Sequence, residues 1–406
     1  MKSLPARHVT SNHSPENEPD RVPPAFGHRP PLDGIRGLAI VGVLMLHSTI
    51  WGAMPSVLPG GNLGVTVFLV LSGFLITTLL CGEHERTGRI DLRAFYVRRS
   101  ARLLPGLLVL LPVYVIVFSR QQTAWQLVLL VGPVLLYLSS FVQAIWGAMG
   151  PLAWTWSLSV EEHFYAFWPP VLRWLFNRRA AERGGVRGWT ARHPLTVASG
   201  IAVLMIAIAT GLRVYLDGSF RWDEFAYYST PTRMDALAVG CLAALFARRC
   251  PRGVPQIAGW AALGVIGWCY ANPHFTIGTD ALDLYGLPLC EVAAAVLIVS
   301  VVNRPRGLLA RALSLRPLVH LGAISYGLYL WNLLPGQTWT MLVGRHAGTA
   351  GTVILFGVMF LAVELSFRYV ERPAMRWAKG RLASGGALVP PRRYRARRLG
   401  RLVREG

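Results

Sequence analysis

The segment LDGIRGLAIVGVLMLHS, residues 32–48, is apolar enough to enter a bilayer yet carries two side chains that could do chemistry. Arg36 stands near its start and His47 follows eleven residues later. Eleven residues make about three turns of an α-helix, so the two share one face, roughly 16 Å apart along the axis. A guanidinium binds anions, and an imidazole can act as a general base or a nucleophile. Because both groups are costly at membrane depth, they indicate a functional site; the alternative is a snorkelling arginine and a histidine bonded to a neighbouring helix.

An acidic pair, Glu161 and Glu162, lies in the otherwise aromatic and apolar stretch TWSLSVEEHFYAFWPP. Neighbouring helical residues point about 100° apart, so at most one of the two faces the same cavity as His47. A carboxylate there could orient the imidazole, raise its basicity or pair with an arginine. Acid near a helix N-terminus is also favourable in itself, which would explain the other glutamate.

A basic cluster in FYVRRSARLLP places Arg98, Arg99 and Arg102 just before an apolar segment. Arg99 and Arg102 are three residues apart and therefore share a helix face. Together they make a fork suited to phosphate groups at the membrane surface. An ordinary basic anchor on the cytoplasmic side is the alternative interpretation.

The elements that carry these residues are membrane helices. Of the 406 residues, 53% are hydrophobic and 15% are charged, whereas soluble proteins usually carry about 25% charged residues. The mean hydropathy is +0.41. The net charge of +21 is scattered between apolar segments, which disfavours nucleic acid as a partner. The five cysteines form no CxxC pair, so neither a metal site nor a disulfide framework is predicted.

Eleven apolar segments follow one another along the chain. They lie near 34–54, 62–81, 103–119, 124–145, 157–176, 195–216, 233–247, 255–271, 282–302, 318–342 and 347–370. Loops rich in arginine, which should be cytoplasmic, lie at 82–102, 173–193, 247–252 and 303–316, and loops near 217–231 and 272–283 should face outward. Three segments lie between the first two basic loops, where only an even number can cross.

We therefore predict an all-α polytopic bundle of about ten crossings with one re-entrant segment at 124–145, which ends in the glycine-rich QAIWGAMGPLAW. Both termini are then cytoplasmic. The predicted organisation is a disordered arm at 1–30 without a signal peptide, a membrane domain at 31–376 and a disordered basic tail at 377–406.

Several motifs occur together in one order: LDGIRGLAIVGVLMLH, GVTVFLVLSGFLIT, RRSARLLP, WSLSVEEHFYAFWP, TRMDALAVG, SYGLYLW and VERP. Over about residues 31–373 the chain resembles the membrane-bound acyltransferase 3 family of integral membrane O-acyltransferases. The resemblance implies an enzyme of the cell (plasma or inner) membrane that transfers an acyl group, commonly acetyl, from acyl-CoA to a hydroxyl. Cell-surface polysaccharides, lipopolysaccharide, other glycans and macrolide-type natural products are the acceptors of the family.

The donor side of this expectation rests on the arginines. Acyl-CoA would be a substrate, with no permanently bound cofactor, and its phosphates would dock on Arg99 and Arg102, with Arg98 beside them. Its other partners would be the lipid bilayer and the hydroxylated carbohydrate or natural product.

The chemical step would fall to the first motif. His47 would act as a general base toward the acceptor hydroxyl or as a transient acyl carrier. Arg36 would anchor the donor or stabilise developing negative charge. Glu161 or Glu162 would hold the imidazole tautomer.

Three positions depart from the family pattern. His163 stands where the family usually has Gln and adds a second candidate base. Asn332 stands where it often has His, and Thr66 where it often has Asp. These two lack the titratable group, which argues against an essential role for them here.

A proton-coupled transporter is the rival class, because intramembrane Arg, His and Glu also build proton relays. A relay that hands acyl groups to another enzyme is a third possibility. A transferase releases free thiol from acyl-CoA when given its acceptor, whereas a transporter does not.

Overall fold

The computed structural model describes residues 27–49, 58–176, 189–190, 192–216, 223–250, 253–344 and 347–385. These ranges are helical with connecting turns, and no strand occurs within them. Most of the predicted arm and all of the tail beyond Gly385 lie outside the described residues.

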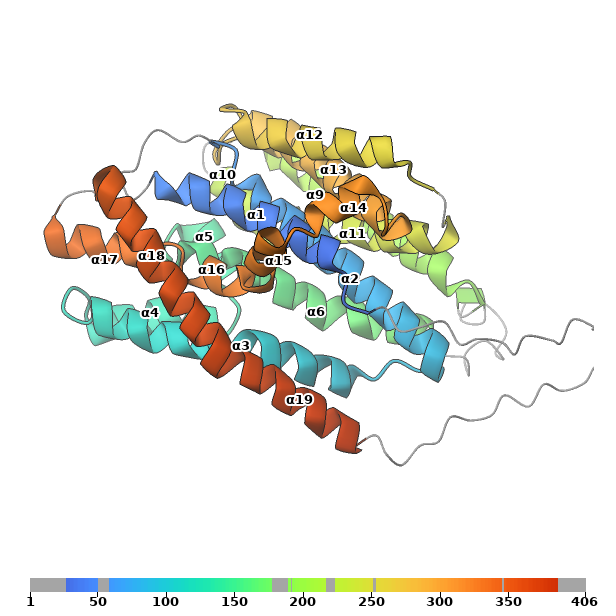
Figure 1. Ribbon diagram of the computed structural model, residues 1–406, viewed down its shortest axis with the longest axis horizontal. Helices are drawn as coiled ribbons and strands as arrows, with labels where there is room; N and C mark the ends of the chain where they lie inside the picture. Colours follow the sequence, from blue (N-terminus) through green and yellow to red (C-terminus); the bar gives the residue numbers. More distant parts are fainter. Residues whose placement is uncertain are drawn as a thin grey trace, which may run out of the picture.

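The helices follow the predicted apolar segments closely. The first half of the chain forms α1 (Pro30–Ser48), α2 (Leu63–Thr87), α3 (Leu92–Phe118), α4 (Ala124–Leu135), α5 (Ser139–Trp146), the 3₁₀-helix η1 (Gly150–Thr155), α6 (Trp156–Leu175) and α9 (Pro194–Leu216). The second half forms α10 (Asp223–Tyr228), α11 (Thr230–Arg249), α12 (Gln256–Ala271), the π-helix η2 (Leu282–Gly286), α13 (Leu287–Asn303), α14 (Leu308–Leu313), α15 (Arg316–Ala323), α16 (Ser325–Trp331), α17 (Leu334–Val343), α18 (Gly348–Ser366), the π-helix η3 (Phe367–Glu371) and α19 (Arg372–Gly385). Figure 1 shows the long helices lying roughly side by side, with α12 along one edge of the view and α3, α4 and α19 along the other.

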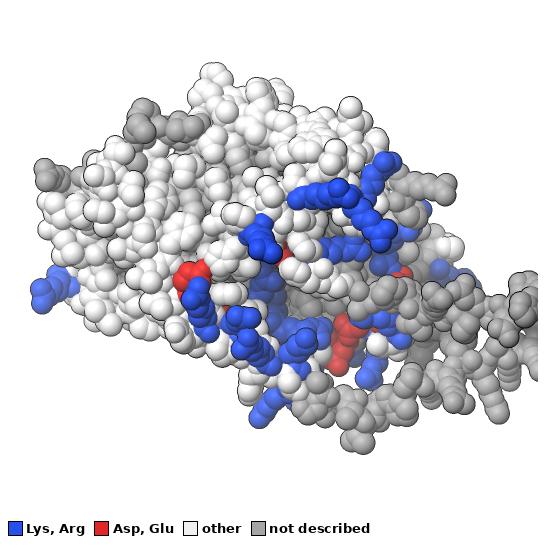
Figure 2. All heavy atoms as spheres, viewed as in Figure 1, with Lys and Arg blue, Asp and Glu red and all other residues white. Residues whose placement is uncertain are grey.

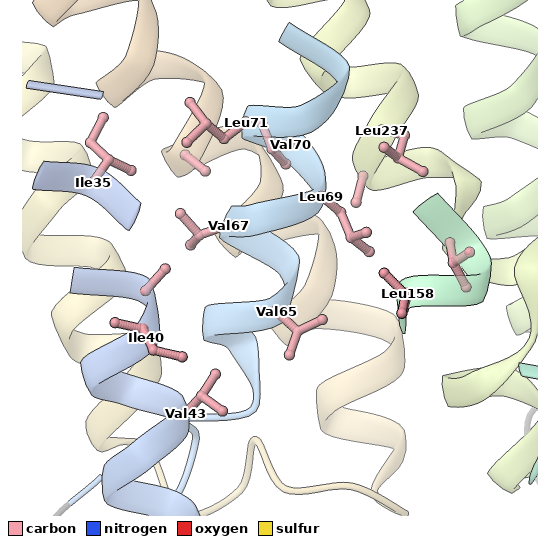
Figure 3. Packing of buried hydrophobic residues seen from close by; sticks show 14 of the residues in the cluster. Ile35, Ile40, Val43, Val65, Val67, Leu69, Val70, Leu71, Leu158 and Leu237 are labelled. Carbon is pink, nitrogen blue, oxygen red and sulfur yellow. The ribbon is translucent and has the colours of Figure 1, made fainter. Parts of the chain in front are cut away.

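Helix α2 is the centre of the packing. In its most apolar stretch 78% of the residues are buried, against 17% for α9. It packs against α1, α6, α11 and α13, and Figure 3 shows its valines and leucines meeting aliphatic side chains of α1, α6 and α11. Glycines bring α2 and α11 into backbone contact, because a Cβ at Gly73 or Gly240 would lie 2.0 Å from a carbonyl oxygen of the other helix. The site-bearing helices are therefore held on a tightly packed centre.

Five helices of the described chain are long and apolar enough to cross a membrane by length and composition. They are Leu63–Thr87, Leu92–Phe118, Pro194–Leu216, Leu282–Asn303 and Gly348–Leu382. The chain is thus a polytopic helical membrane protein, and ten crossings remain a prediction. Other segments miss that standard because they carry charges, as α1 and α6 do, or because they are broken into shorter pieces.

The predicted re-entrant segment is broken. Helix α4 ends at Leu135 and α5 begins at Ser139, and Tyr137 between them has a φ of 56°. Twelve residues in α4 extend about 18 Å at 1.5 Å per residue, less than the hydrocarbon core of about 30 Å. The break fits the predicted incomplete crossing.

Two predicted segments differ from the structure. The single segment expected at 318–342 is divided into α15, α16 and α17, because turns interrupt it near Ile324 and Asn332. The tail expected to be disordered from 377 begins as helix, since α19 continues through Gly385.

Basic side chains gather at one end of the bundle. Figure 2 shows most of the visible Lys and Arg toward the end at which α2 and α19 finish, while most of the remaining face is uncharged. At this end Arg248 pairs with Glu85 and joins α11 to α2. The distribution agrees with arginine-rich loops on one side of a membrane.

Candidate active site

A cavity of about 80 Å³ lies between α1, α2, α3, α6 and α16, and we call it the arginine cavity. Its charged lining consists of Arg36, Arg99, Arg102 and Glu161. Helical spacing explains the convergence, since Arg99 and Arg102 share one face of α3, as predicted. The structure thus brings together, in one cavity, charged residues that stand more than a hundred positions apart in the sequence.

The three arginines differ in their partners. Arg36 Nη1 donates to Asp33 Oδ1 at 3.0 Å, and Arg99 Nη2 donates to Glu161 Oε2 at 2.9 Å. Arg102 makes no hydrogen bond or salt bridge with any residue in the described part of the chain. Two of the three cations are balanced by carboxylates and one is not. The cavity therefore favours an anionic ligand.

Glu161 is the hub of this cavity. Besides Arg99, it accepts hydrogen bonds from Ser72 Oγ at 2.9 Å and from the Tyr165 hydroxyl at 2.6 Å. The Arg99 guanidinium also lies 3.9 Å from the centroid of the Tyr165 ring. These contacts fix the direction of the Arg99 fork before any ligand arrives.

Arg98 lies outside the arginine cavity. Its side chain is 51% exposed and its Nη2 is 3.6 Å from Glu83 Oε2. One position along a helix turns a side chain by about 100°, which separates Arg98 from Arg99. The predicted trio is thus a pair in the cavity and one arginine at the surface.

A second cavity, of about 360 Å³, contains His47 and is called the His47 cavity. It lies among the C-terminal end of α1, the N-terminal ends of α2 and α6, helix α10, and the turn after α12. Aromatic residues form much of its wall: Trp154, Trp156, Tyr227, Tyr228 and Tyr329. No Asp, Glu, Lys or Arg is among its described lining residues.

The two cavities adjoin. Val65 and Tyr329 line both of them. The Tyr329 hydroxyl donates to the Trp154 carbonyl oxygen at 2.6 Å and is 2.6 Å from Ser157 Oγ, which acts as the donor because the tyrosine proton is already used. Arg36 and His47, predicted on one helix face, therefore lie in two different cavities. We call the residues between them, Val65 and Tyr329, the partition.

The acidic pair does not reach His47. Glu161 belongs to the arginine cavity, and Glu162 lines neither cavity; its Oε1 is buried without a hydrogen-bond partner among the described residues. The expectation that one of them holds the His47 tautomer is not supported, because Glu161 is committed to Arg99. Asn332, between Tyr329 and Leu333 of the His47 cavity, has a side chain that interacts with the imidazole.

His163 also lies away from the site. Its Nδ1 is 2.7 Å from Thr230 Oγ1, and its ring centroid is 5.5 Å from that of Phe141. It lines neither cavity. The geometry gives it a packing role and no access to either cavity as a second base.

A buried polar cluster stands behind the His47 cavity. Arg233 Nη2 donates to Thr66 Oγ1 at 2.7 Å, and its guanidinium lies 5.2 Å from the centroid of the Tyr227 ring. Asp235 pairs with Arg213 rather than with Arg233, because side chains two residues apart on a helix do not face each other. The cluster supports the aromatic wall from outside.

Sequence reasoning overlooked the partition and the aromatic wall. Tyr329 lies in the motif SYGLYLW, and the wall comes from the dense aromatic runs LAWTW and FAYY. Aromatic residues are common in apolar helices, so their joint position appears only when α6, α10 and α16 are placed together. The two aromatic runs were the sequence signal from which the wall could have been predicted.

These features define an integral membrane protein with two adjoining sites, one basic and one aromatic. Within the described residues, no group of three or more His, Cys, Asp or Glu could hold a metal ion. A family model described as an acyltransferase domain matches residues 30–368, so the chain belongs to this acyltransferase family, as its motifs predict.

The chain is similar to several curated proteins. It is 28% identical over 372 residues to "O-acetyltransferase OatA" of Staphylococcus aureus (strain NCTC 8325 / PS 47), covering 85% of this chain and 57% of that protein. It is 29% identical over 369 residues to "Peptidoglycan O-acetyltransferase OatA" of Listeria monocytogenes, covering 85% and 55%. It is 28% identical over 383 residues to "Putative peptidoglycan O-acetyltransferase YrhL" of Bacillus subtilis (strain 168), covering 85% of this chain and 54% of that protein.

The matched region thus spans little more than half the length of these relatives. No solved structure shows a significant match to the chain.

Proposed function

We propose that the protein is a membrane O-acetyltransferase that takes an acetyl group from acetyl-CoA and passes it to a sugar hydroxyl of peptidoglycan. Family membership and the names of the similar proteins support the reaction and the acceptor. Among the acceptors that the sequence motifs left open, peptidoglycan is favoured over lipopolysaccharide and macrolides. The observation that carries the proposal is the pair of adjoining cavities, one suited to an anionic donor and one to a sugar.

The donor would enter the arginine cavity. Coenzyme A carries several phosphate charges, and Arg102 offers a guanidinium without a hydrogen-bond or ion-pair partner among the described residues. Arg36 lies in the same cavity, which favours its role as a donor anchor over a role at the reacting carbonyl beside His47. The flexible pantetheine arm would carry the thioester toward Val65 and Tyr329.

The acceptor would occupy the His47 cavity. Its aromatic walls offer faces on which a sugar ring can pack, and their hydroxyl groups can exchange hydrogen bonds with the sugar. The absence of charged groups from its described lining suits a neutral sugar hydroxyl as the group presented to His47.

The reaction would then proceed at the partition. His47 removes the proton from the acceptor hydroxyl as its oxygen attacks the thioester carbonyl carbon, forming a C–O bond. The C–S bond breaks, and the departing thiolate of coenzyme A takes the proton back from His47. The products are an acetyl ester and free coenzyme A. A transient acetyl group on His47 is the alternative route.

The orientation follows from the basic loops. With both termini on the cytoplasmic side, the arginine cavity lies toward the cytoplasm, near the starts of α1 and α3. The His47 cavity then lies toward the outer face, near the end of α1 and the starts of α2 and α6. Donor and acceptor would approach from opposite sides of the cell membrane.

The proposal is tested with the purified protein, acetyl-CoA and soluble peptidoglycan fragments. We expect acceptor-dependent release of free thiol, together with acetyl ester on the sugar detected by mass spectrometry. Release of neither product with any peptidoglycan fragment, while acetyl-CoA still binds, would contradict the acceptor assignment. Proton-coupled uptake of a solute without thiol release would favour the transporter.

A further inference from the structure

Asn332 follows the last residue of α16 and lies in the short break before α17, and it is completely buried. Its Nδ2 donates to the Tyr329 carbonyl oxygen at 2.6 Å. This bond fixes the amide, so the nitrogen is committed to the backbone of α16 and the oxygen projects from the other side. The Asn332 amide nitrogen is therefore anchored, and its oxygen, Oδ1, is available as an acceptor.

The available half of the amide lies toward the His47 cavity. Asn332 stands between Tyr329 and Leu333, which both line that cavity, and its side chain interacts with the imidazole. His47 Nδ1 and Asn332 Oδ1 are both buried, and neither completes a hydrogen bond in the described structure. The two atoms complement each other, because an amide oxygen only accepts and a protonated imidazole nitrogen donates.

The other groups of the described lining have different surroundings. Asn62 also carries an amide, whose nitrogen faces the Gly60 and Phe275 carbonyl oxygens. The described lining of its cavity holds no Asp, Glu, Lys or Arg, and its titratable members besides His47 are Tyr227, Tyr228 and Tyr329. The Tyr329 hydroxyl is already bonded to Trp154 and Ser157. The glutamate first considered for orienting His47 is bonded to Arg99. A neutral amide is the acceptor placed at the buried nitrogen.

We propose that Asn332 is the positioning residue of the active site: its Oδ1 accepts the proton of His47 Nδ1 and so leaves Nε2 unprotonated for the acceptor hydroxyl. The inference rests on the proposed function, in which His47 is the base. The side-chain partner of a histidine selects which ring nitrogen carries the proton. Asn332 would do this without adding a charge at membrane depth, where a carboxylate is costly.

Two substitutions at this position separate positioning from structure. Asn332→Leu removes both halves of the amide, and we expect kcat to fall roughly 100-fold, the scale of general-base catalysis, with KM for acetyl-CoA and for the peptidoglycan fragment nearly unchanged. Asn332→Asp retains an oxygen toward His47 and has no amide nitrogen for the Tyr329 carbonyl. We expect it to restore kcat to within roughly tenfold of the parent.

The control is Asn303→Leu, which removes another amide that donates to a backbone carbonyl, that of Cys250, far from either cavity. It should leave both kcat and KM unchanged. His47→Ala is measured in parallel. All variants are compared as purified full-length protein with matched thermal stability.

The outcomes distinguish the two proposals. Suppose that His47→Ala is inactive. If Asn332→Leu then keeps kcat within twofold of the parent, or if Asn332→Asp and Asn332→Leu lower kcat equally, the positioning role is wrong and the proposed function stands. If His47→Ala retains activity, the base assignment in the proposed function is wrong. The inference is supported if Asn332→Leu has a low kcat, Asn332→Asp recovers most of the kcat, and Asn303→Leu has the kcat of the parent.

Discussion

The arginine cavity and the His47 cavity share Val65 and Tyr329 but differ in almost every other property. The first, about 80 Å³, is lined by three arginines and a glutamate. The second, about 360 Å³, is lined by aromatic and small polar groups with no charged residue in its described lining. Two neighbouring sites with such different chemistry are suited to two different substrates.

The difference also shows how charge is tolerated in this bundle. The Arg36 and Arg99 guanidinium groups are bonded to carboxylates, and Arg102 lies beside them. Polar groups of the His47 cavity include neutral hydroxyls bonded to backbone carbonyls, as those of Thr49 and Tyr329 are. Charged side chains therefore line the arginine cavity, whereas those near the His47 cavity, Arg233 and the pair Arg213–Asp235, stand behind its wall with polar partners, which limits the cost of burying charge at membrane depth.

The largest effect should come from the His47 cavity. His47→Ala should lower the transfer rate by roughly 100-fold or more, because it removes the general base. Membrane insertion and expression should stay near normal, since removing a polar group from an apolar helix does not hinder insertion. Initial rates of thiol release measure the effect.

The control for this substitution is His320→Ala, which removes an exposed histidine bonded to Glu364 at 2.5 Å, outside both cavities. It should leave the rate unchanged. A His47→Ala rate within a few-fold of the parent would make His47 a structural residue and remove the chemical difference between the cavities.

A smaller effect should appear on the donor side. Arg102→Ala removes the cation that has no ion-pair partner in the described part of the chain, unlike Arg99→Ala, which would take from Glu161 its paired cation. A charge-assisted hydrogen bond contributes about 1.5–3 kcal/mol, so KM for acetyl-CoA should rise roughly 10- to 100-fold. Arg98→Ala, at the surface beside Glu83, should leave that KM unchanged. A change confined to the acceptor KM would refute the docking role.

The aromatic wall should show the smallest kinetic effect. Tyr228→Ala should raise KM for the peptidoglycan fragment about threefold to tenfold, because an aromatic contact contributes roughly 0.5–1.5 kcal/mol beyond area burial. KM for acetyl-CoA should not change. Tyr215→Ala, which removes a tyrosine 83% exposed on α9, is the matched control. Equal rises in both KM values would mean that the wall does not belong to the acceptor alone.

The opposite orientation of the cavities requires α4 and α5 together not to cross the membrane. Cys250 is the exposed cysteine, and the other four are buried, so Gln121→Cys and Gly147→Cys can be introduced in a Cys250→Ser background. An impermeant maleimide should label both new cysteines in intact cells. In the parent protein, the native Cys250 should be labelled only after permeabilisation. Labelling of positions 121 and 147 from opposite sides would overturn the re-entrant assignment.

The sequence predicted the helices well because apolar length and arginine-rich loops are local signals. It predicted one segment at 318–342, where the structure has α15, α16 and α17. The breaks leave Tyr329 in the lining of both cavities. The second break comes just before Pro335, which stands in the first turn of α17 and was a local signal for a helix start.

The site was predicted in part. That Arg99 and Arg102 lie in one cavity follows from the helix face they share, whereas Arg36 was given two alternative roles and its position beside them comes from the structure. The partner of each group does not follow from the sequence, because hydrogen bonding depends on distances between helices far apart in the chain. Glu161 or Glu162 was expected near His47, and Glu161 is bonded to Arg99. Asn332, set aside for lacking a titratable group, lies between Tyr329 and Leu333 of the His47 cavity.

The central claim, that the two cavities serve opposite sides of one membrane, is tested most directly in sealed proteoliposomes. Radiolabelled acetyl-CoA is enclosed in the lumen, and soluble peptidoglycan fragment is supplied only outside. The account predicts labelled acetyl ester on the external fragment, abolished by His47→Ala and reduced by Arg102→Ala at limiting acetyl-CoA. Ester formation only when donor and acceptor are present on the same side would contradict it.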